Sequence, residues 1–349
     1  MAPLWTRPFP GARGGNGSIQ RGFVLATTLW MLAILTVAAG YFASRIQHAR
    51  DLAQMAQAHA QSVRDLYGAR AEILFRIGTT QFSSYGLGSS EKDAIALDDR
   101  PYLATGDTLV RLQDDRGLLN LNAADDVRLG RFLSILGVPT ARHAALIDAL
   151  HDYVDDDDLK RLNGAEASDY AAAGLPPPRN ARLVTPMEAR RIFGWGDVPQ
   201  LWQDNLLSRL TTTGSSFSLN PNTAPWQVLA TMGGMTPDAA RAVIQAREVA
   251  PIVDANRLET LTGIQIHNDP FTPDMIAFPA DSVRVTQQAN ALTWGLQYNV
   301  TLTPVSDTAP WRIDYSYRVE LSSIQSARQD VKSLPARAAS HPESPVPFF

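Results

Sequence analysis

The sequence predicts an α+β protein in which a long N-terminal helix precedes an antiparallel sheet, and a large helical block interrupts that sheet. Three observations lead to this prediction. An uncharged apolar run lies near the N-terminus, alternating apolar and polar residues flank the middle of the chain, and the middle is helical in pattern and punctuated by Gly and Pro. The 349 residues are enough for two compact units, or for one domain with a large insertion.

The composition excludes several classes of function. The chain has no cysteine, so it has no disulfides, no thiol catalysis and no thiolate metal site. A net charge of −4 gives no reason to expect a nucleic-acid partner. The sequence contains no zinc-protease spacing of histidines, no nucleophile elbow and no phosphate-binding loop. We therefore expect a protein that is not an enzyme.

The N-terminus combines a basic leader with an apolar span. Residues 1–22 contain Arg7, Arg13 and Arg21 and no acidic residue, whereas residues 23–43 carry no charge. A helix of that length spans roughly 30 Å, the thickness of a bilayer core, and a soluble core helix rarely stays uncharged for so long. Arginines on one side favour retention of that side in the cytoplasm. These features predict a single-pass membrane anchor.

Two cleavage sites are compatible with this N-terminus. The small residues Val37-Ala38-Ala39 would suit an ordinary signal peptidase, although the apolar run exceeds the roughly 7–15 residues of a signal sequence. A basic leader that ends in Arg21-Gly22 directly before Phe23 resembles the prepilin peptidase site of type IV pilin-like proteins. The resemblance implies cleavage after Gly22, retention of the apolar helix, and an N-methylated Phe23.

The fifth residue after Gly22 is Thr27. Major pilin-like subunits carry Glu at this position, where it neutralises the amino terminus of a neighbouring subunit. A carboxylate in lipid is costly unless it is paired, and a subunit with nothing above it has no such neighbour. Absence of that Glu is typical of the K-type minor pseudopilin. The resemblance therefore implies a place at the tip of the filament.

Apolar residues continue at helical spacing through residues 44–77, which contain no proline. One helix over 23–77 is predicted. A break near Gly40 or Gly68 is the alternative, although one Gly weakens a helix by only about 1 kcal/mol.

Alternating residues predict strands on both sides of the helical block. They lie at 108–113, 282–288, 293–302 and 311–321, and the last two form a predicted hairpin. The tail is rich in Pro, Ser and Ala, which predicts disorder. The chain is thus divided into leader 1–22, membrane helix 23–43, periplasmic helix with first strands 44–113, helical block 114–279, closing strands 280–327 and disordered tail 328–349.

The helical block contains two related asparagine motifs about a hundred residues apart. NLNAA begins at Asn120, and NPNTA begins at Asn220. We expect Asn122 to cap the helix that follows it, and the repetition to reflect duplicated helical modules.

The second module also carries the turns 233–237 and 258–264 and resembles a helix-hairpin-helix, or SAM-like, unit. Many such units bind DNA through hairpin N–H groups and basic side chains. This hairpin offers only Arg241 and Arg247, with acidic residues beside them, so a packing role is the favoured interpretation.

An acidic cluster follows the first module. Seven carboxylates lie between Asp152 and Asp169, opposed by Lys160 and Arg161. A Ca²⁺ ion would remove their mutual repulsion, while a solvated acidic loop is the alternative. The spacing is not that of an EF-hand, because Leu159 and Lys160 stand at ligand positions.

The segment DYVDDDDLKRLNGAEASDY resembles a segment of type II secretion system protein K, with Tyr153 in place of Trp. That segment contributes to bound calcium in the family. The resemblance implies Asp152, Asp155, Asp157 and Glu166 as Ca²⁺ ligands, with Asp158 as a further candidate.

All these motifs occur in the order found in protein K, a minor pseudopilin. The resemblance implies a pilin-like antiparallel sheet with a helical insertion, one inner-membrane span, and a bulk of the chain in the periplasm. It implies as partners the I- and J-type subunits, the prepilin peptidase, and the secretin or exported proteins. The rival hypotheses are a membrane-tethered DNA-binding protein of an uptake system and a secreted calcium-dependent hydrolase.

Overall fold

The computed structural model describes residues 19–214, 216–266, 273–320 and 331–335. It divides the chain into two units, Met1–Ala60 and Gln61–Phe349. The leader before residue 19 lies outside the described residues.

The first unit consists of the greater part of helix α1 (Ile19–Thr79), which passes Gly40 and Gly68 without a break. The single helix is thus confirmed, and neither Gly is required by packing, because a Cβ at either position would meet no atom within 4 Å. The apolar side chains of this unit are exposed, and Phe23 and Trp30 are both 72% exposed. Among the described residues one helix is long and apolar enough to cross a membrane, and its most apolar window is 0% buried. Such a surface needs an apolar environment from outside the chain.

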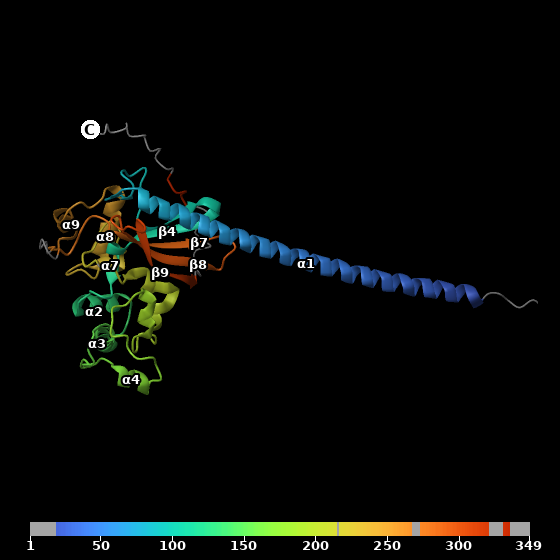
Figure 1. The fold of residues 1–349 in the computed structure, drawn as a ribbon, viewed down its shortest axis with the longest axis horizontal. Helices are drawn as coiled ribbons and strands as arrows, with labels where there is room; N and C mark the ends of the chain where they lie inside the picture. Colours follow the sequence, from blue (N-terminus) through green and yellow to red (C-terminus); the bar gives the residue numbers. More distant parts are fainter. Residues whose placement is uncertain (1–18, 215, 267–272, 321–330, 336–349) are drawn as a thin grey trace, which may run out of the picture. The chain divides into compact units, whose positions relative to one another are not determined.

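The second unit is built on a five-stranded antiparallel sheet of order β3-β4-β7-β8-β9 (Figure 1). The strands are β3 (Asp98–Ala104), β4 (Thr108–Asp114), β7 (Ser282–Gln288), β8 (Trp294–Leu302) and β9 (Trp311–Glu320). The four predicted strands and the β8–β9 hairpin are confirmed. β3 has no counterpart among the predictions, because its first residues are charged and Pro101 interrupts the alternation. A small hairpin, β1 (Phe82–Ser83) with β2 (Gly86–Leu87), precedes it.

The last turns of α1 cover one face of this sheet (Figure 1). Ile73 and Ile77 are buried against apolar residues of the strands, among them Val285. Arg70 lies over the ring of Tyr298, 5.1 Å from its centroid. The helix thus joins the sheet through an apolar stripe, as its 3.6-residue period allows.

The helical block is inserted in the chain between β4 and β7, two strands that are neighbours in the sheet. Its helices are α2 (Asp126–Ile135), α3 (His143–Val154), α4 (Ala167–Ala172), α5 (Pro199–Trp202), α6 (Leu206–Leu210), α7 (Trp226–Leu229), α8 (Pro237–Val249) and α9 (Ala255–Thr262). They enclose a separate apolar core around the fully buried Trp195. The block is not purely helical, because β5 (Leu119–Asn120) pairs in parallel with β6 (Thr211–Thr212).

Of the predicted disordered tail, residues 331–335 are described, and they belong to the fold. Ser333 forms a parallel bridge with Leu103 of β3. Backbone hydrogen bonds on both sides of that bridge hold these five residues, so the tail prediction is wrong for them. The remaining tail residues lie outside the described residues.

Candidate functional site

The predicted cleavage junction lies within α1. Gly22 precedes Phe23 in the second turn of the helix, which begins at Ile19. The hydroxyl of Thr27 lies 3.1 Å from the carbonyl of Phe23 and 2.9 Å from that of Val24. The helix itself therefore satisfies this donor, as hydroxyl residues commonly do in membrane helices. Position 27 presents no charge and no unmet polar group.

The acidic cluster lies in the loop between α3 and α4. Asp152 is fully buried on the last turn of α3, Asp155 follows that helix directly, and Glu166 precedes α4 with 6% exposure. A Cβ on Gly164 would lie 1.9 Å from a carboxylate oxygen of Asp152. Only Gly allows the loop to approach this carboxylate so closely. Asp157 lies exposed in the loop, and its Oδ1 accepts a hydrogen bond of 2.8 Å from the backbone of Leu159.

These carboxylates have too few donors. Three of their oxygens are buried: both carboxylate oxygens of Glu166 and the Oδ1 of Asp155. None of the three has a hydrogen-bond partner among the described residues. Asp152 accepts from the backbone N–H of Arg161 at 3.2 Å. Buried oxygens without donors are costly, and oxygens of this kind are what a Ca²⁺ ion binds.

Burial raises the pKa of Asp152, Asp155 and Glu166 above the usual carboxyl values. For Glu166 the negative charges of Asp152, Asp155 and the following aspartates raise the pKa further. The structure thus brings the predicted ligands Asp152, Asp155 and Glu166 into one electrostatic cluster, with Asp157 acting on it through its charge.

The loop does not form a closed coordination site as it stands. In the part of the chain that the structure describes, no three His, Asp or Glu side chains are arranged to hold a metal ion. The donor types and the unpartnered buried oxygens fit Ca²⁺, whereas the geometry would have to tighten around it. The Ca²⁺ site stays a prediction.

The asparagine motifs serve another purpose than capping. The cap of α2 is Asp125, whose carboxylate accepts from the N–H of Arg128 at 2.7 Å, so the prediction for Asn122 is wrong. Asn122 instead accepts from the N–H of Leu183 at 2.8 Å and donates to the carbonyls of Leu183 and Thr213 at 3.0 and 3.1 Å. Its partners are distant in sequence, and no local pattern reveals them.

The second motif makes equivalent bonds. Asn222 accepts from the N–H of Ile252 and donates to its carbonyl, both at 2.8 Å. In each motif the first Asn side chain, Asn120 or Asn220, accepts at 3.0 Å from the N–H two residues later. Matching bonds in both motifs support the predicted duplication.

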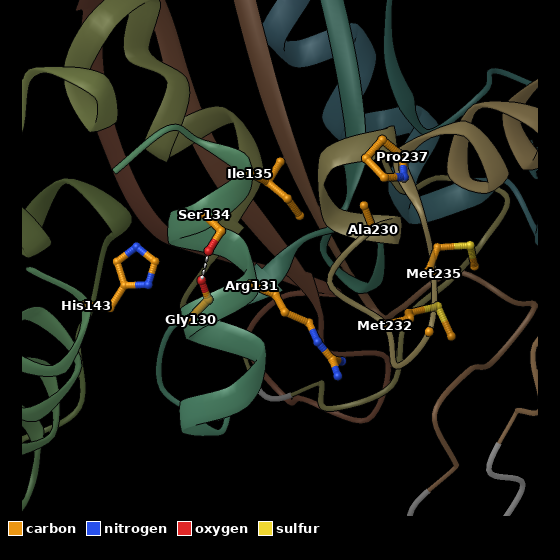
Figure 2. Close-up of a pocket in the computed structure, with 10 residues that line it drawn as sticks. Gly130, Arg131, Ser134, Ile135, His143, Ala230, Met232, Met235 and Pro237 are labelled. Carbon is orange, nitrogen blue, oxygen red and sulfur yellow. Dashed lines mark hydrogen bonds between the residues drawn. The ribbon is translucent and has the colours of Figure 1, made fainter. Parts of the chain in front are cut away.

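Each module has a glycine in the left-handed region at its hairpin: Gly137 (φ 75°) and Gly234 (φ 77°). Residues of both modules line a pocket of about 610 Å³. Figure 2 shows these residues. Ile135 lines the pocket from the first module, and Met232 and Met235 from the second. The ring of His143 on its wall is bound to the carbonyl of Val138 at 2.9 Å, which gives it a structural role.

The two basic residues of the hairpin module are engaged within the protein. Arg247 donates to the carbonyls of Pro221 and Ala224 at 2.9 and 2.6 Å, and its side chain is 8% exposed. Arg241 pairs with Asp238 at 2.8 Å and lies over the ring of Trp226. Arg247 is buried and cannot contact DNA, which leaves Arg241 as the exposed cation of this pair, and one exposed arginine beside an aspartate gives the DNA-binding alternative little support.

Asp114, to which no sequence motif points, is among the buried residues that join the block to the sheet. Its Oδ2 accepts from Asn220 at 2.9 Å and from Thr223 at 2.8 Å. Its Oδ1 accepts from the N–H groups of Arg116 and Ala280 at 3.0 and 2.8 Å. The sequence signal that could have identified it is an Asp directly after the predicted strand 108–113 and a few residues before the first asparagine motif.

The described residues thus combine an exposed apolar helix that ends on an antiparallel sheet with a helical block inserted between neighbouring strands, a layout consistent with a pseudopilin that has a single membrane anchor. Two segments of the chain match the family of type II secretion system (T2SS) protein K, residues 108–200 and residues 219–274. Each match contains one of the asparagine motifs, and the first also contains the acidic loop. The chain therefore carries both protein K domains, and the resemblance seen in its motifs is confirmed.

A solved structure is also similar to the chain. It is a chain of the GspK-GspI-GspJ complex from the Type 2 Secretion System of enterotoxigenic Escherichia coli. The two are 15% identical with a TM-score of 0.48, over 79% of this chain and 99% of that chain. None of the curated proteins matches the sequence.

Proposed function

We propose that the chain is the minor pseudopilin at the tip of a type II secretion pseudopilus, where it starts assembly. The observation that carries this proposal is the uncharged Thr27 in the exposed apolar part of α1. Its hydroxyl donates to backbone carbonyls of the same helix. A subunit inside the filament needs a carboxylate there for the amino terminus of its neighbour. A tip subunit has no such neighbour, and an unpaired carboxylate in lipid would only destabilise it.

The helical block supports the same role. It adds a second large core to the sheet and is tied to β4 and β7 through Asp114 and its partners. In the proposed assembly this rigid mass prevents another subunit from being added above, and its surface is available to the secretin or to exported proteins.

Assembly proceeds with subunits of the I and J types. The solved complex holds GspI and GspJ together with GspK, and we extend that composition to the partners of this chain. The apolar face of α1, which no other described residue covers in its most apolar window, packs against the corresponding helices of these subunits.

Processing precedes assembly. Prepilin peptidase cuts after Gly22, Phe23 is N-methylated, and α1 stays in the inner membrane with the second unit in the periplasm. The uncharged side chains from Phe23 onward support retention of the span.

The acidic loop binds Ca²⁺ in this proposal. Asp152, Asp155, Asp157 and Glu166 would hold the ion, whose positive charge compensates the buried carboxylates that now lack donors. The ion would fix the loop between α3 and α4, and it has no part in any reaction.

The deciding experiment is the intact mass of the mature protein, produced with and without prepilin peptidase. We expect a chain that starts at methylated Phe23 only when the peptidase is present. Gly22→Val should abolish this processing, whereas Ala39→Val, at the ordinary signal-peptidase site, should leave it unchanged.

A mature chain that starts near Gly40 would exclude the proposal in favour of a secreted protein. If the processed protein failed to co-purify with I- and J-type subunits from detergent, the tip role would be overturned even with the correct N-terminus.

A further inference from the structure

β3 forms one edge of the five-stranded sheet, and the chain's own segment 331–335 lies on it. The N–H of Leu103 donates to the carbonyl of Lys332 at 2.9 Å, and the N–H of Leu334 donates to the carbonyl of Leu103 at 2.9 Å. This is the parallel bonding pattern of an added strand. The segment therefore uses β3 as extended peptides use sheet edges in recognition domains.

Two further contacts hold the segment. The side chain of Leu334 packs against the core between α1 and the sheet. The carbonyl of Pro335 accepts a hydrogen bond of 3.0 Å from Arg76, which Glu72 orients through an ion pair of 2.9 Å. Lys332 and Ser333 are exposed. Recognition thus rests on backbone groups, one aliphatic side chain and one carbonyl.

The edge is short for a clear reason. Along a strand, alternate residues direct their backbone groups to the same side, so Pro101 and Leu103 share the outer edge. Pro101 has no N–H to donate, and the register with β4 shifts between Asp98 and Pro101. Leu103 is therefore the residue of β3 whose donor and acceptor are both offered to an incoming strand.

The segment can reach this edge within its own chain. Glu320 pairs with Trp294, and through the register of the sheet it lies at the same end as Leu103, across four strand intervals. That distance is about 19 Å at the usual strand spacing. The ten residues 321–330 can extend to about 33 Å, so they are long enough to cross it.

The edge also borders a cavity of about 660 Å³. Val331, Lys332 and Ser333 line it together with Tyr102 and Arg247. The Nε of Arg247 is buried and has no hydrogen-bond partner among the described residues. The part of a bound strand on the N-terminal side of the Leu103 bonds would therefore lie along this cavity, as Val331 does.

We propose that the outer edge of β3 at Leu103 is a binding site for extended peptides, and that segment 331–335 is its tethered resident ligand. The site takes a strand parallel to β3, with an aliphatic residue at the place of Leu334. Two backbone–backbone hydrogen bonds, one hydrogen bond from the Arg76 side chain to the Pro335 carbonyl, and one half-buried Leu give weak intrinsic binding. A short tether supplies an effective concentration on the order of millimolar, which keeps the site filled but exchangeable.

The test uses the full-length protein in detergent and a fluorescent peptide with the sequence of residues 329–337, measured by anisotropy. We expect no binding to the wild type, whose own segment fills the site. Binding should appear in a variant that lacks residues 331–349 and in the full-length variant Leu334→Asp. Ser333→Asp, at the exposed neighbour, should behave as the wild type.

Peptides methylated on single backbone nitrogens give the matched control. A methyl group on the Leu334 nitrogen removes the bond to Leu103 and should weaken binding at least tenfold, whereas one on the Ser333 nitrogen should not. Binding that is indifferent to the methylated position, or absent in folded variants, would overturn the proposal. So would the finding that neither variant folds, because the segment would then be an integral part of the sheet.

Discussion

The carboxylate of Asp114, at the end of β4, accepts a hydrogen bond of 2.8 Å from the hydroxyl of Thr223 in the second asparagine motif. The same carboxylate binds Asn220 and the N–H of Ala280. One buried side chain thus connects the sheet, the second helical module and the segment that leads back into β7. The helical block and the sheet are therefore joined within one compact unit.

Asp114→Ala should lower the free energy of unfolding by about 3 kcal/mol or more, because it leaves several buried donors without an acceptor. Asp114→Asn should cost somewhat less, because the amide keeps one oxygen as acceptor. Denaturant unfolding of the purified protein measures both. Asp307→Ala, in the exposed β8–β9 loop, is the control and should change little. Equal stability of Asp114→Ala and the control would contradict the central role of Asp114.

Local patterns predicted the parts of the fold that local patterns determine. The uncharged span and the helical period identified α1, and alternation identified β7, β8 and β9. β3 escaped prediction because Pro101 and a register shift disturb its alternation. The acidic loop was visible as a run of carboxylates. The roles of Asn122 and Asp114 were not, because their hydrogen bonds join segments about sixty or more positions apart.

The two asparagine motifs should differ in how much they stabilise the protein. Asn122→Ala removes three partly buried hydrogen bonds to backbone groups, and Asn222→Ala removes two. At about 1 kcal/mol for each bond, we expect losses of about 3 and 2 kcal/mol. Asn256→Ala, on the exposed face of α9, should be nearly neutral. Denaturation midpoints at a constant m-value provide the comparison, and a larger loss for Asn222→Ala would refute the ranking.

The acidic loop should respond to pH and to Ca²⁺ in opposite ways. Burial raises the pKa of Asp155 and Glu166, so the folded loop holds protons more tightly than the unfolded chain. Without Ca²⁺, its stability should therefore fall as pH rises from the usual carboxyl range near 4 through the raised pKa. Ca²⁺ needs the ionised carboxylates, so its stabilising effect should grow over the same window.

Hydrogen exchange of residues 155–166 measures both effects. In EDTA we expect the exchange rate to rise between acidic pH and pH 7 by more than the intrinsic pH dependence of amide exchange explains. Added Ca²⁺ should slow the exchange at pH 7. Glu166→Gln removes one buried charge, so it should slow exchange in EDTA and weaken the effect of Ca²⁺. Asp156→Asn, exposed and outside the candidate ligand set, is the matched control. Exchange in the wild type that ignores Ca²⁺ would rule out the site.

Thr27→Glu should impair the start of pseudopilus assembly, because a tip subunit offers no amino terminus to pair with the new carboxylate. An unpaired carboxylate in an apolar helix costs up to about 3 kcal/mol on insertion scales. Thr28→Glu is the control, because the native Thr28 hydroxyl also donates to a carbonyl of the helix and the variant places the same charge one residue away. It distinguishes the general cost of a carboxylate in lipid from an effect specific to position 27. Thr27→Val, which removes only the hydroxyl, should be tolerated. Secretion and filament number in cells that carry each variant are the measurements. Filaments of normal number that carry the Thr27→Glu subunit along their length would show that position 27 does find a partner, and the tip assignment would have to be abandoned.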